Sequence, residues 1–169
     1  MIQSDEHGRI NLWPLALVIH DSDVPRLGAS AQGPVIFVRA NHRDNDALLA
    51  HELEHVRQWW VAGLIGAVLC ALLGAVVGWQ SSSYVGLLPA VGADPIPAVV
   101  GALLGLPAHS WLMLISARYR LWCEIRGYRV QLAHQPARHR EHYRRVYADM
   151  LANSYELGLT PDEAAEALR

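Results

Sequence analysis

Lysine, cysteine and charge are the scarce features of this sequence. All 14 basic residues are arginine, which we attribute to a bias toward GC-rich codons and not to mechanism. No CxxC motif is present, and the two cysteines lie in unlike settings, Cys70 in an apolar run and Cys123 beside Glu124. These features exclude a disulfide framework. Long Ser, Pro or Gln tracts are also missing, and a hydrophobic share of 52% excludes a disordered chain.

Charge is almost absent from the centre of the chain. Of the 14 basic and 16 acidic residues, only Asp94 lies between residues 58 and 117. A length of 169 residues excludes a large multidomain enzyme, and charge divided in this way is typical of a membrane protein with polar ends. Residues 1–6 are polar and acidic, so no secretory signal peptide is expected there. Membrane targeting is therefore expected to come from internal apolar segments.

The first apolar segment, residues 61–78, has the length of a membrane span. It carries no charge, and as a helix it would be roughly 27 Å long, close to the hydrocarbon thickness of a bilayer. Trp60 precedes it and Trp79 follows it, as in an interfacial aromatic belt. Gly74 and Gly78, four residues apart, suit close helix packing in lipid. The alternative is a buried core helix of a soluble protein, although so short a chain has little protein to surround one.

A second apolar segment, residues 96–117, predicts a span that returns the chain to the same side. Residues 80–84 are predicted to form a polar turn after the first span. Pro107 is expected to kink the second span. His109 lies within it, and we expect its neutral imidazole to bond a backbone carbonyl freed by the proline; a functional role is the alternative at this depth. Residues 59–117 are thus predicted to form a transmembrane helical hairpin.

Arginines flank the hairpin and set its expected orientation. Arg57 precedes the first span, Arg118 and Arg120 follow the second, and the connecting loop contains no arginine. The positive-inside rule places both ends on the cytoplasmic side of a bacterial inner membrane. Residues 118–145 contain most of the arginines, and we expect this stretch to meet anionic lipid headgroups. No nucleic-acid partner is expected, because no nucleic-acid motif accompanies it.

Outside the hairpin the sequence predicts a mainly α-helical fold with a small β element. Residues 10–20 and 35–40 are predicted to be short strands. The Asp-, Ser-, Gly- and Pro-rich stretch between them, residues 21–33, is predicted to be a loop. A helix is expected to follow, with Asp44 or Asn45 as its N-cap.

Residues 51–55, His-Glu-Leu-Glu-His, match the H-E-x-x-H pattern on that predicted helix. His51 and His55 are one turn apart, so both imidazoles project to one side and can bind one Zn²⁺. Glu52 adjoins the first histidine and is placed to act as general base toward the attacking water. The alternative is that the two histidines are solvent-facing helix residues.

The longer phrase His-Glu-Leu-Glu-His-Val-Arg-Gln resembles the active-site helix of gluzincin-type zinc metallopeptidases. In that family a glutamate on a downstream helix is the third zinc ligand, often within an E-x-x-A-Y-like phrase. Residues 123–128, Cys-Glu-Ile-Arg-Gly-Tyr, look like this element, with a glycine where a small residue is usual. The resemblance implies that His51, His55 and Glu124 bind Zn²⁺. It also implies that Glu52 is the catalytic base.

The resemblance covers residues 35–58 and 118–135 and leaves the hairpin outside it. No H-x-x-G-x-x-H extension is present, which excludes the metzincin pattern. An alternative for Glu124 is an ion pair with Arg120, four residues earlier. Glu54 is expected to be an exposed carboxylate or one that hydrogen-bonds a metal ligand and orients it. Tyr128 is expected to orient a ligand in this way or to stabilise an oxyanion. The tyrosines considered for that last role are Tyr119, Tyr128 and Tyr155.

The apolar segments also predict the height of the proposed ligands. Residue 53, the midpoint of the histidine pair, lies six residues before Trp59, and Glu124 lies six residues after Arg118. At 1.5 Å per residue, both would sit roughly 9 Å above the same membrane boundary. An antiparallel hairpin would therefore bring Glu124 opposite the two histidines.

The sequence thus predicts a small membrane-anchored zinc metallopeptidase that cleaves a peptide or protein held near the membrane. Its parts would be residues 1–58 with the H-E-x-x-H helix, 59–117 as the hairpin, and 118–169 with the Glu124 helix and terminal helices. The strand at 35–40 is expected to bind an extended substrate along its edge. Membrane lipids and a homo-oligomer or larger assembly are the other expected partners. The alternative is a non-catalytic protein with a zincin fold, such as a membrane-interacting component of a phage or secretion particle.

Overall fold

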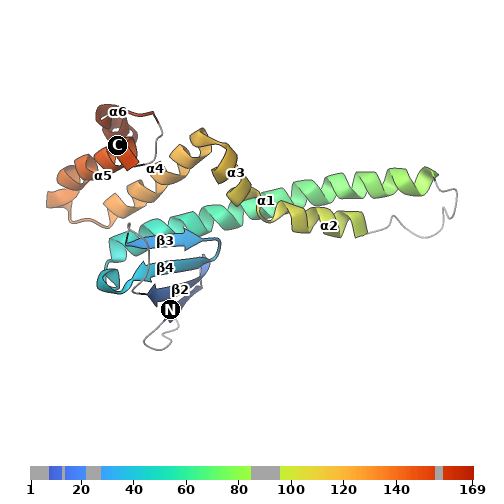
Figure 1. The fold of residues 1–169 in the computed structure, drawn as a ribbon, viewed down its shortest axis with the longest axis horizontal. Coiled ribbons are helices and arrows are strands. Elements are labelled where there is room, and N and C mark those ends of the chain that lie inside the picture. The colour runs from blue at the N-terminus through green and yellow to red at the C-terminus, as the bar shows by residue number, and fades with distance from the viewer. Residues whose placement is uncertain (1–7, 13, 22–27, 85–95, 155–157) are drawn as a thin grey trace. The chain divides into compact units, whose positions relative to one another are not determined.

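The described part of the chain forms two compact units. One comprises Met1–Gln58 and Met113–Arg169, and the other Trp59–Leu112. The chain is mainly helical with a small sheet, which confirms the predicted fold class at this level (Figure 1). The computed structural model describes residues 8–12, 14–21, 28–84, 96–154 and 158–169.

The sheet has four strands in the order β1-β2-β4-β3. Figure 1 shows β2, β4 and β3 side by side. β1 (Gly8–Leu12) and β2 (Leu15–Asp21) form an antiparallel hairpin. β2 runs parallel to β4 (Val35–Arg39), and β4 confirms the strand predicted at residues 35–40. The prediction of one continuous strand at residues 10–20 is wrong. The chain turns at Pro14, whose missing N–H cannot join a ladder.

The stretch predicted to be a loop contains the remaining strand, β3 (Ala29–Gln32), which pairs antiparallel with β4. Gly33 and Pro34 connect the two strands, and Gly33 has a φ of 61°, the positive value that the first position of a tight hairpin turn requires. β4 is therefore an interior strand, and β3 lies at the edge. The prediction that residues 35–40 offer a free edge is wrong. Residues 22–27 of the predicted loop lie outside the described residues.

One face of the sheet is buried, as the two-residue period of a strand dictates. On β2 and β4 the residues that point to this face have exposed fractions of 0–3%: Ala16, Val18, Ile36 and Val38. Glu52, on the helix that follows the sheet, accepts a hydrogen bond from the backbone of Ala31 in β3. The edge strand therefore lies beside the first turn of the H-E-x-x-H motif.

That helix, α1 (Asp46–Tyr84), is 39 residues long. Asn45 is its N-cap, because its side-chain Oδ1 accepts a hydrogen bond from the Leu48 N–H at 3.0 Å. The polar turn predicted at residues 80–84 is wrong, since α1 continues through them. Residues 80–84 contain no glycine or proline to end the helix. Each residue added to an existing helix gains a hydrogen bond, so the helix continues.

One described helix is long and apolar enough to cross a membrane, the Asp46–Gln80 part of α1, and little of its apolar window is buried. α2 (Ile96–Gly105) and α3 (Ala108–Ile115) meet the same criterion together as one bent span. The bend between them is 48° and lies at Pro107, which confirms the predicted kink. The described residues thus contain one such helix, or two if the bent pair is one span.

Within the second unit, α1 meets the two following helices at glycines. A Cβ added to Gly63 would lie 2.7 Å from the carbonyl oxygen of Leu106, and one added to Gly66 would lie 2.6 Å from Cβ of Ala108. Gly101 on α2 likewise approaches the α1 backbone too closely for a side chain. The glycines therefore permit the helices to pack backbone against backbone, as small residues do in membrane proteins.

The substitution Gly66→Val is expected to lower the free energy of unfolding by about 1–3 kcal/mol, the usual effect of overpacking. The added methyl groups would collide with Ala108 and the backbone beside it. Unfolding of the full chain in an uncharged detergent measures the effect. Ala75→Val is the matched control, because Ala75 is exposed on the same helix. Equal loss in both variants would contradict the packing that the structure shows.

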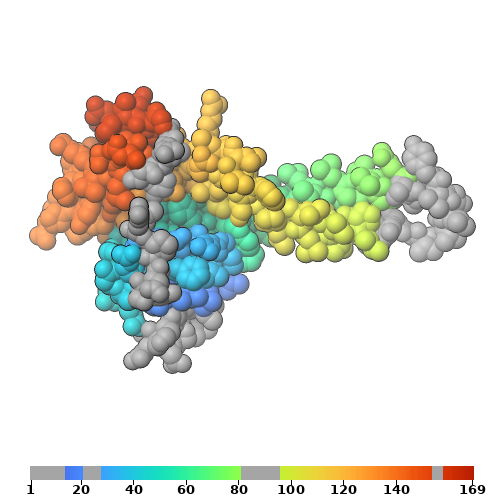
Figure 2. Space-filling model, viewed as in Figure 1, coloured from blue at the N-terminus to red at the C-terminus, as the bar shows by residue number. Residues whose placement is uncertain are grey.

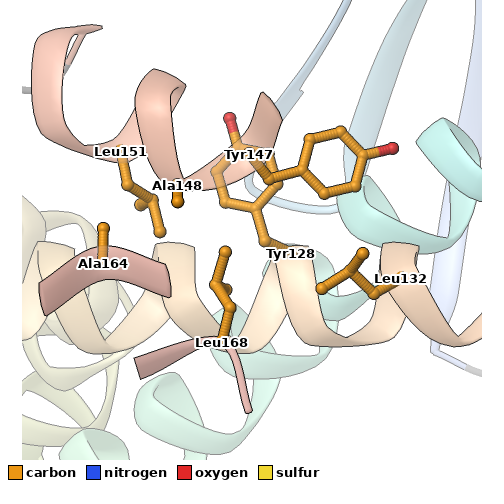
Figure 3. Packing of buried hydrophobic residues seen from close by; sticks show 7 residues of the cluster. All are labelled: Tyr128, Leu132, Tyr147, Ala148, Leu151, Ala164 and Leu168. Atoms are coloured by element: carbon orange, nitrogen blue, oxygen red, sulfur yellow. The ribbon is translucent and has the colours of Figure 1, made fainter. Parts of the chain in front are cut away.

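Three C-terminal helices complete the first unit: α4 (Ala117–Ala133), α5 (Arg140–Ser154) and α6 (Pro161–Ala167). The short 3₁₀ helices η1 (Ala40–His42) and η2 (Ala137–His139) precede α1 and α5. Figure 2 shows α5 and α6 packed against each other, in orange to red. Their shared core with α4 is drawn in Figure 3 and consists of Tyr128, Leu132, Tyr147, Ala148, Leu151, Ala164 and Leu168.

Local capping signals fix where two of these helices begin. Ser116 Oγ accepts a hydrogen bond from the Tyr119 N–H at 3.2 Å, which starts α4 directly after the apolar segment. Sequence also predicts the start of α6, because Thr160 and Glu163 have capping-box spacing. The structure confirms it: the Glu163 carboxylate accepts the Thr160 N–H at 2.8 Å, and Thr160 Oγ1 accepts the Glu163 N–H at 3.3 Å.

Candidate metal centre

His51, His55 and Glu124 meet inside the first unit. The Nε2 atoms of the two histidines are 3.0 Å apart. Oε2 of Glu124 lies 3.6 Å from Nε2 of His51, and its Oε1 lies 3.7 Å from Nε2 of His55. Tetrahedral zinc with bonds of about 2.0–2.1 Å holds its ligand atoms roughly 3.3 Å apart. The three side chains therefore have the spacing of a single metal site.

Two neighbours on α4 explain why His51 can lie this close to that helix. A Cβ on Gly127 would lie 2.8 Å from the His51 ring, so any larger residue there would push the imidazole away. The ring of Tyr128 meets the His51 ring edge-on, with centroids 4.6 Å apart. Since Tyr128 is itself held in the core of α4, α5 and α6, the orientation of His51 is set by packing.

The donor set fits a divalent cation such as Zn²⁺. Oε2 of Glu124 is buried and has no hydrogen-bond partner among the described residues, although a buried polar atom left unpaired costs about 1–3 kcal/mol. A cation between the two imidazoles and this carboxylate would satisfy it. Two nitrogens and a carboxylate are a known zinc set, and they leave a fourth position for water or substrate.

The same proximity makes Glu124 and His55 an ion pair in the metal-free chain. Burial would raise the pKa of Glu124, but the neighbouring His51 and His55 imidazoles lower it to about 2. Burial would lower the pKa of His55, but the Glu124 carboxylate raises it to about 9. Glu124 is therefore a charged carboxylate at neutral pH, which is the form that binds a metal ion.

Gln58 supports His55 from the side opposite Glu124. Its Oε1 lies 3.1 Å from Nδ1 of His55, while its amide nitrogen donates to Oε1 of Glu54 and to the carbonyl of Cys123, both at 3.3 Å. These two acceptors fix the amide orientation, so Nδ1 of His55 must be the donor to Gln58. In the metal-free chain the Nε2–H of the protonated ring faces Glu124, and loss of that proton would leave Nε2 with a lone pair for a metal.

Glu54 links the two helices that carry the three candidate ligands. Its carboxylate accepts from Nε of Arg57 at 2.8 Å and from Nε of Arg126 on α4 at 2.9 Å. Burial would raise the pKa of Glu54, but the two guanidinium groups lower it below its usual value. Only 8% of the Glu54 side chain is exposed, so the alternative of an exposed carboxylate is wrong. Glu54 supports the site through Gln58 and Arg126.

Two further alternatives from the sequence are wrong. His51 is buried and the His55 side chain is 12% exposed, so neither is a solvent-facing helix residue. Arg120 does not pair with Glu124, because its Nη1 donates to the carbonyls of Met113 at 2.8 Å and Leu114 at 3.2 Å. The Glu124 carboxylate faces His51 and His55 instead.

Glu52 is buried between the metal cluster and the sheet edge. Burial raises the pKa of its carboxyl group, although His51 and His55 act to lower it. The backbone of Ala31 in β3 donates to the same carboxylate. Glu52 is not one of the three candidate ligands, but from this position it could exchange a proton with a molecule bound beside them.

Two of the three tyrosines considered for an oxyanion role lie within the described residues. Tyr128 contacts a candidate ligand through the His51 ring. Tyr119 stacks on Trp122, with ring centroids 5.7 Å apart. Tyr155 lies outside the described residues, and His109 is buried in α3, in the other unit. The oxyanion role of Tyr128 stays a prediction.

Gln58 and Arg126 are the residues that the sequence analysis missed. Gln58 belongs to the phrase that resembles the gluzincin helix, and it lies four residues after Glu54 and three after His55. That spacing places all three side chains on one face of the helix, which is the signal that could have found it. Arg126 offers no such signal, since its partner Glu54 is 72 residues away.

Comparison of the chain with protein-family models, with curated proteins and with solved structures finds no match. The resemblance to gluzincins therefore stays a prediction that rests on residues 35–58 and 118–135 of this sequence. The structure brings His51, His55 and Glu124 together in a group that could hold a metal ion.

Proposed function

We propose that this chain is a zinc-dependent metalloendopeptidase of gluzincin type, anchored in a membrane by a helical hairpin. The observation that carries the proposal is the meeting of two imidazoles and one carboxylate, from helices far apart in sequence, with Glu52 beside them. An H-E-x-x-H pentapeptide could arise by chance. The Glu124 carboxylate oxygens, however, lie 3.6 and 3.7 Å from the Nε2 atoms of His51 and His55, and only the folded chain brings these distant segments together.

His51 and His55 would hold Zn²⁺ through Nε2, and Glu124 would hold it through its carboxylate. Zinc bound there supplies a Lewis acid that polarises a peptide carbonyl and lowers the pKa of water. Glu52 takes a proton from the attacking water on a carboxylate oxygen and passes it to the leaving amine. Its buried carboxylate lies beside the two imidazoles and is placed to do both.

The substrate is a peptide in extended conformation that pairs with the edge of β3. Among the described strands β3 pairs only with β4, so its other edge offers backbone groups for β-augmentation. The Ala31–Glu52 hydrogen bond places that edge beside the general base. A peptide bond held along β3 would therefore lie within reach of the proposed chemistry.

The hairpin would consist of α1 and the bent pair α2 and α3, embedded in the bacterial inner membrane with the metal centre on the cytoplasmic side. Support comes from composition, since Arg57 and Arg118 flank the apolar segments. It also comes from the many large apolar side chains exposed on these helices, which include Leu64, Val68, Leu72, Val76, Val99 and Leu103. In water such a surface would drive association.

Metal analysis and a peptidase assay on the full chain in an uncharged detergent test the proposal. We expect about one zinc per chain, with hydrolysis of a peptide library that a chelator abolishes and added zinc restores. Hydrolysis that resists the chelator, or a chain that binds no zinc, would overturn the metallopeptidase. Bound zinc without hydrolysis would favour the non-catalytic alternative.

Gln58→Met is expected to weaken zinc binding about 10- to 100-fold, the usual cost of removing a group that orients a ligand. Methionine keeps the size of the side chain but cannot accept from Nδ1 of His55. Gln135→Met is the matched control, because it removes a glutamine hydrogen bond, to the Tyr147 hydroxyl, outside the metal centre and should keep wild-type affinity. Competition with a chromophoric chelator measures both, and equal affinity in wild type and Gln58→Met would refute the orienting role.

A further inference from the structure

A cavity of about 500 Å³ lies between α4, α5 and the C-terminal end of α6. It belongs to the first unit and uses none of the residues of the metal centre. The residues that line it are Arg129, Leu132, Ala133, Arg140, Glu141, Arg144, Leu168 and Arg169.

Four of these residues are arginines and one is acidic, so the lining is strongly basic. Arg129 Nε donates to the carbonyl of Ala167, and Arg140 donates from Nε to Gln135 and from Nη2 to Ala133. A guanidinium has five N–H donors, so these carbonyls anchor the two side chains and leave most of their donors for a ligand.

Arg144 gives the most direct sign of a missing partner. Its Nη2 pairs with Oε2 of Glu141, but its Nε is buried and has no hydrogen-bond partner among the described residues. An unpaired buried donor is unfavourable, more so when it is charged. An anionic oxygen in the cavity would satisfy it.

Two buried apolar side chains form part of the cavity wall. Leu132 and Leu168 line the cavity and are also members of the packed core of α4, α5 and α6 (Figure 3). Charges beside a wall of low polarity interact more strongly with a ligand than charges surrounded by water. Of the four arginines in the lining, Arg144 is partly buried, and the other three are exposed to solvent.

We propose that this cavity binds a phosphate group. Planar guanidinium donors match the oxygens of phosphate in pairs, and several of them can bind its oxygens together. A phosphate group of this kind is present on soluble phosphate esters and on the headgroups of phospholipids. Binding here is a property separate from peptide hydrolysis, because the two sites share no residue.

Calorimetric titration of the full chain in uncharged detergent with inorganic phosphate tests the site. The pair R140Q and R144Q is expected to weaken binding at least about tenfold. R118Q and R138Q together remove the same charge from exposed positions outside the lining and should leave affinity nearly unchanged. Equal loss in both pairs, or no binding by wild type at about 10 mM phosphate, a concentration typical of weak surface association, would overturn the proposal.

A gain of affinity separates binding from misfolding. Glu141→Gln removes the acidic group from the lining and releases Arg144, so phosphate should bind severalfold more tightly. Asp149→Asn is the control, because it removes one negative charge from the same helix outside the cavity. Unchanged affinity in Glu141→Gln would overturn the proposal, while zinc content should stay the same in every variant.

Competition between ligands distinguishes the two sources of phosphate. Short-chain phosphatidic acid that displaces inorganic phosphate from wild type, but binds no better than phosphatidylcholine to the R140Q and R144Q variant, assigns the cavity to a lipid headgroup. Phosphate binding that the lipid does not displace assigns it to a soluble phosphate ester.

Discussion

Glu52→Gln is expected to reduce turnover about 10²–10⁴-fold, the range for loss of a general acid–base group, with one zinc ion still bound. Glutamine has the size of glutamate, and its carbonyl oxygen can still accept the hydrogen bond from Ala31. It cannot take a proton from water. Because Glu52 is not among the three grouped ligands, the metal should remain.

Turnover of a quenched fluorescent peptide and zinc content, measured on the same preparation, check this result. Glu166→Gln is the matched control, since Glu166 is an exposed glutamate on α6 that pairs with Arg169. It should keep wild-type turnover. Equal product from wild type and Glu52→Gln would end the enzyme interpretation, and loss of zinc would show that Glu52 acts on the metal itself.

Helix starts could be predicted from the sequence because their signals are local. Asn45 reaches the Leu48 N–H three residues away, and Thr160 and Glu163 cap each other within one turn. The end of α1 could not be predicted in the same way. Residues 80–84 are polar, but nothing in them stops a helix that is already formed.

The sheet was the least predictable part, since its pairing is not local. Ala29–Gln32 has no β-branched or aromatic residue, and strand propensity alone gives no reason to expect β3. The strand exists because Gly33 and Pro34 fold it back onto β4. That one hairpin moves the free edge from β4 to β3, and with it the surface proposed for substrate.

The three candidate ligands were accessible to sequence reasoning, the histidines through helical periodicity and Glu124 through the phrase that resembles the third-ligand element of gluzincins. The helical repeat pairs His51 with His55, and the equal distances of both segments from the apolar stretch favour Glu124 as their neighbour. Their support was accessible only in part. Gln58 shares a helix face with Glu54 and His55, but its contact with Cys123, 65 residues away, leaves no periodic trace.

Glu124→Gln is expected to weaken zinc binding by at least about a hundredfold, the upper limit for loss of a group that only orients a ligand. Glutamine fills the same space, but a neutral amide oxygen is a much poorer zinc ligand than a carboxylate. The two histidines remain and cannot hold the metal tightly by themselves. The alternative is that Glu124 does not bind the metal and is only an ion-pair partner of His51 and His55.

Unfolding with and without zinc separates these roles, because a ligand stabilises the folded state by RT ln(1 + [L]/Kd). At free zinc about 100 times the wild-type Kd, wild type gains about 2.7 kcal/mol, whereas a hundredfold weaker site gains only about 0.4 kcal/mol. Glu54→Gln is the matched control: it removes another buried carboxylate of α1, so it should lower stability without zinc and retain most of the zinc-dependent gain. If zinc raises the free energy of unfolding of Glu124→Gln as much as that of wild type, Glu124 is only an ion-pair partner and is not the third metal ligand.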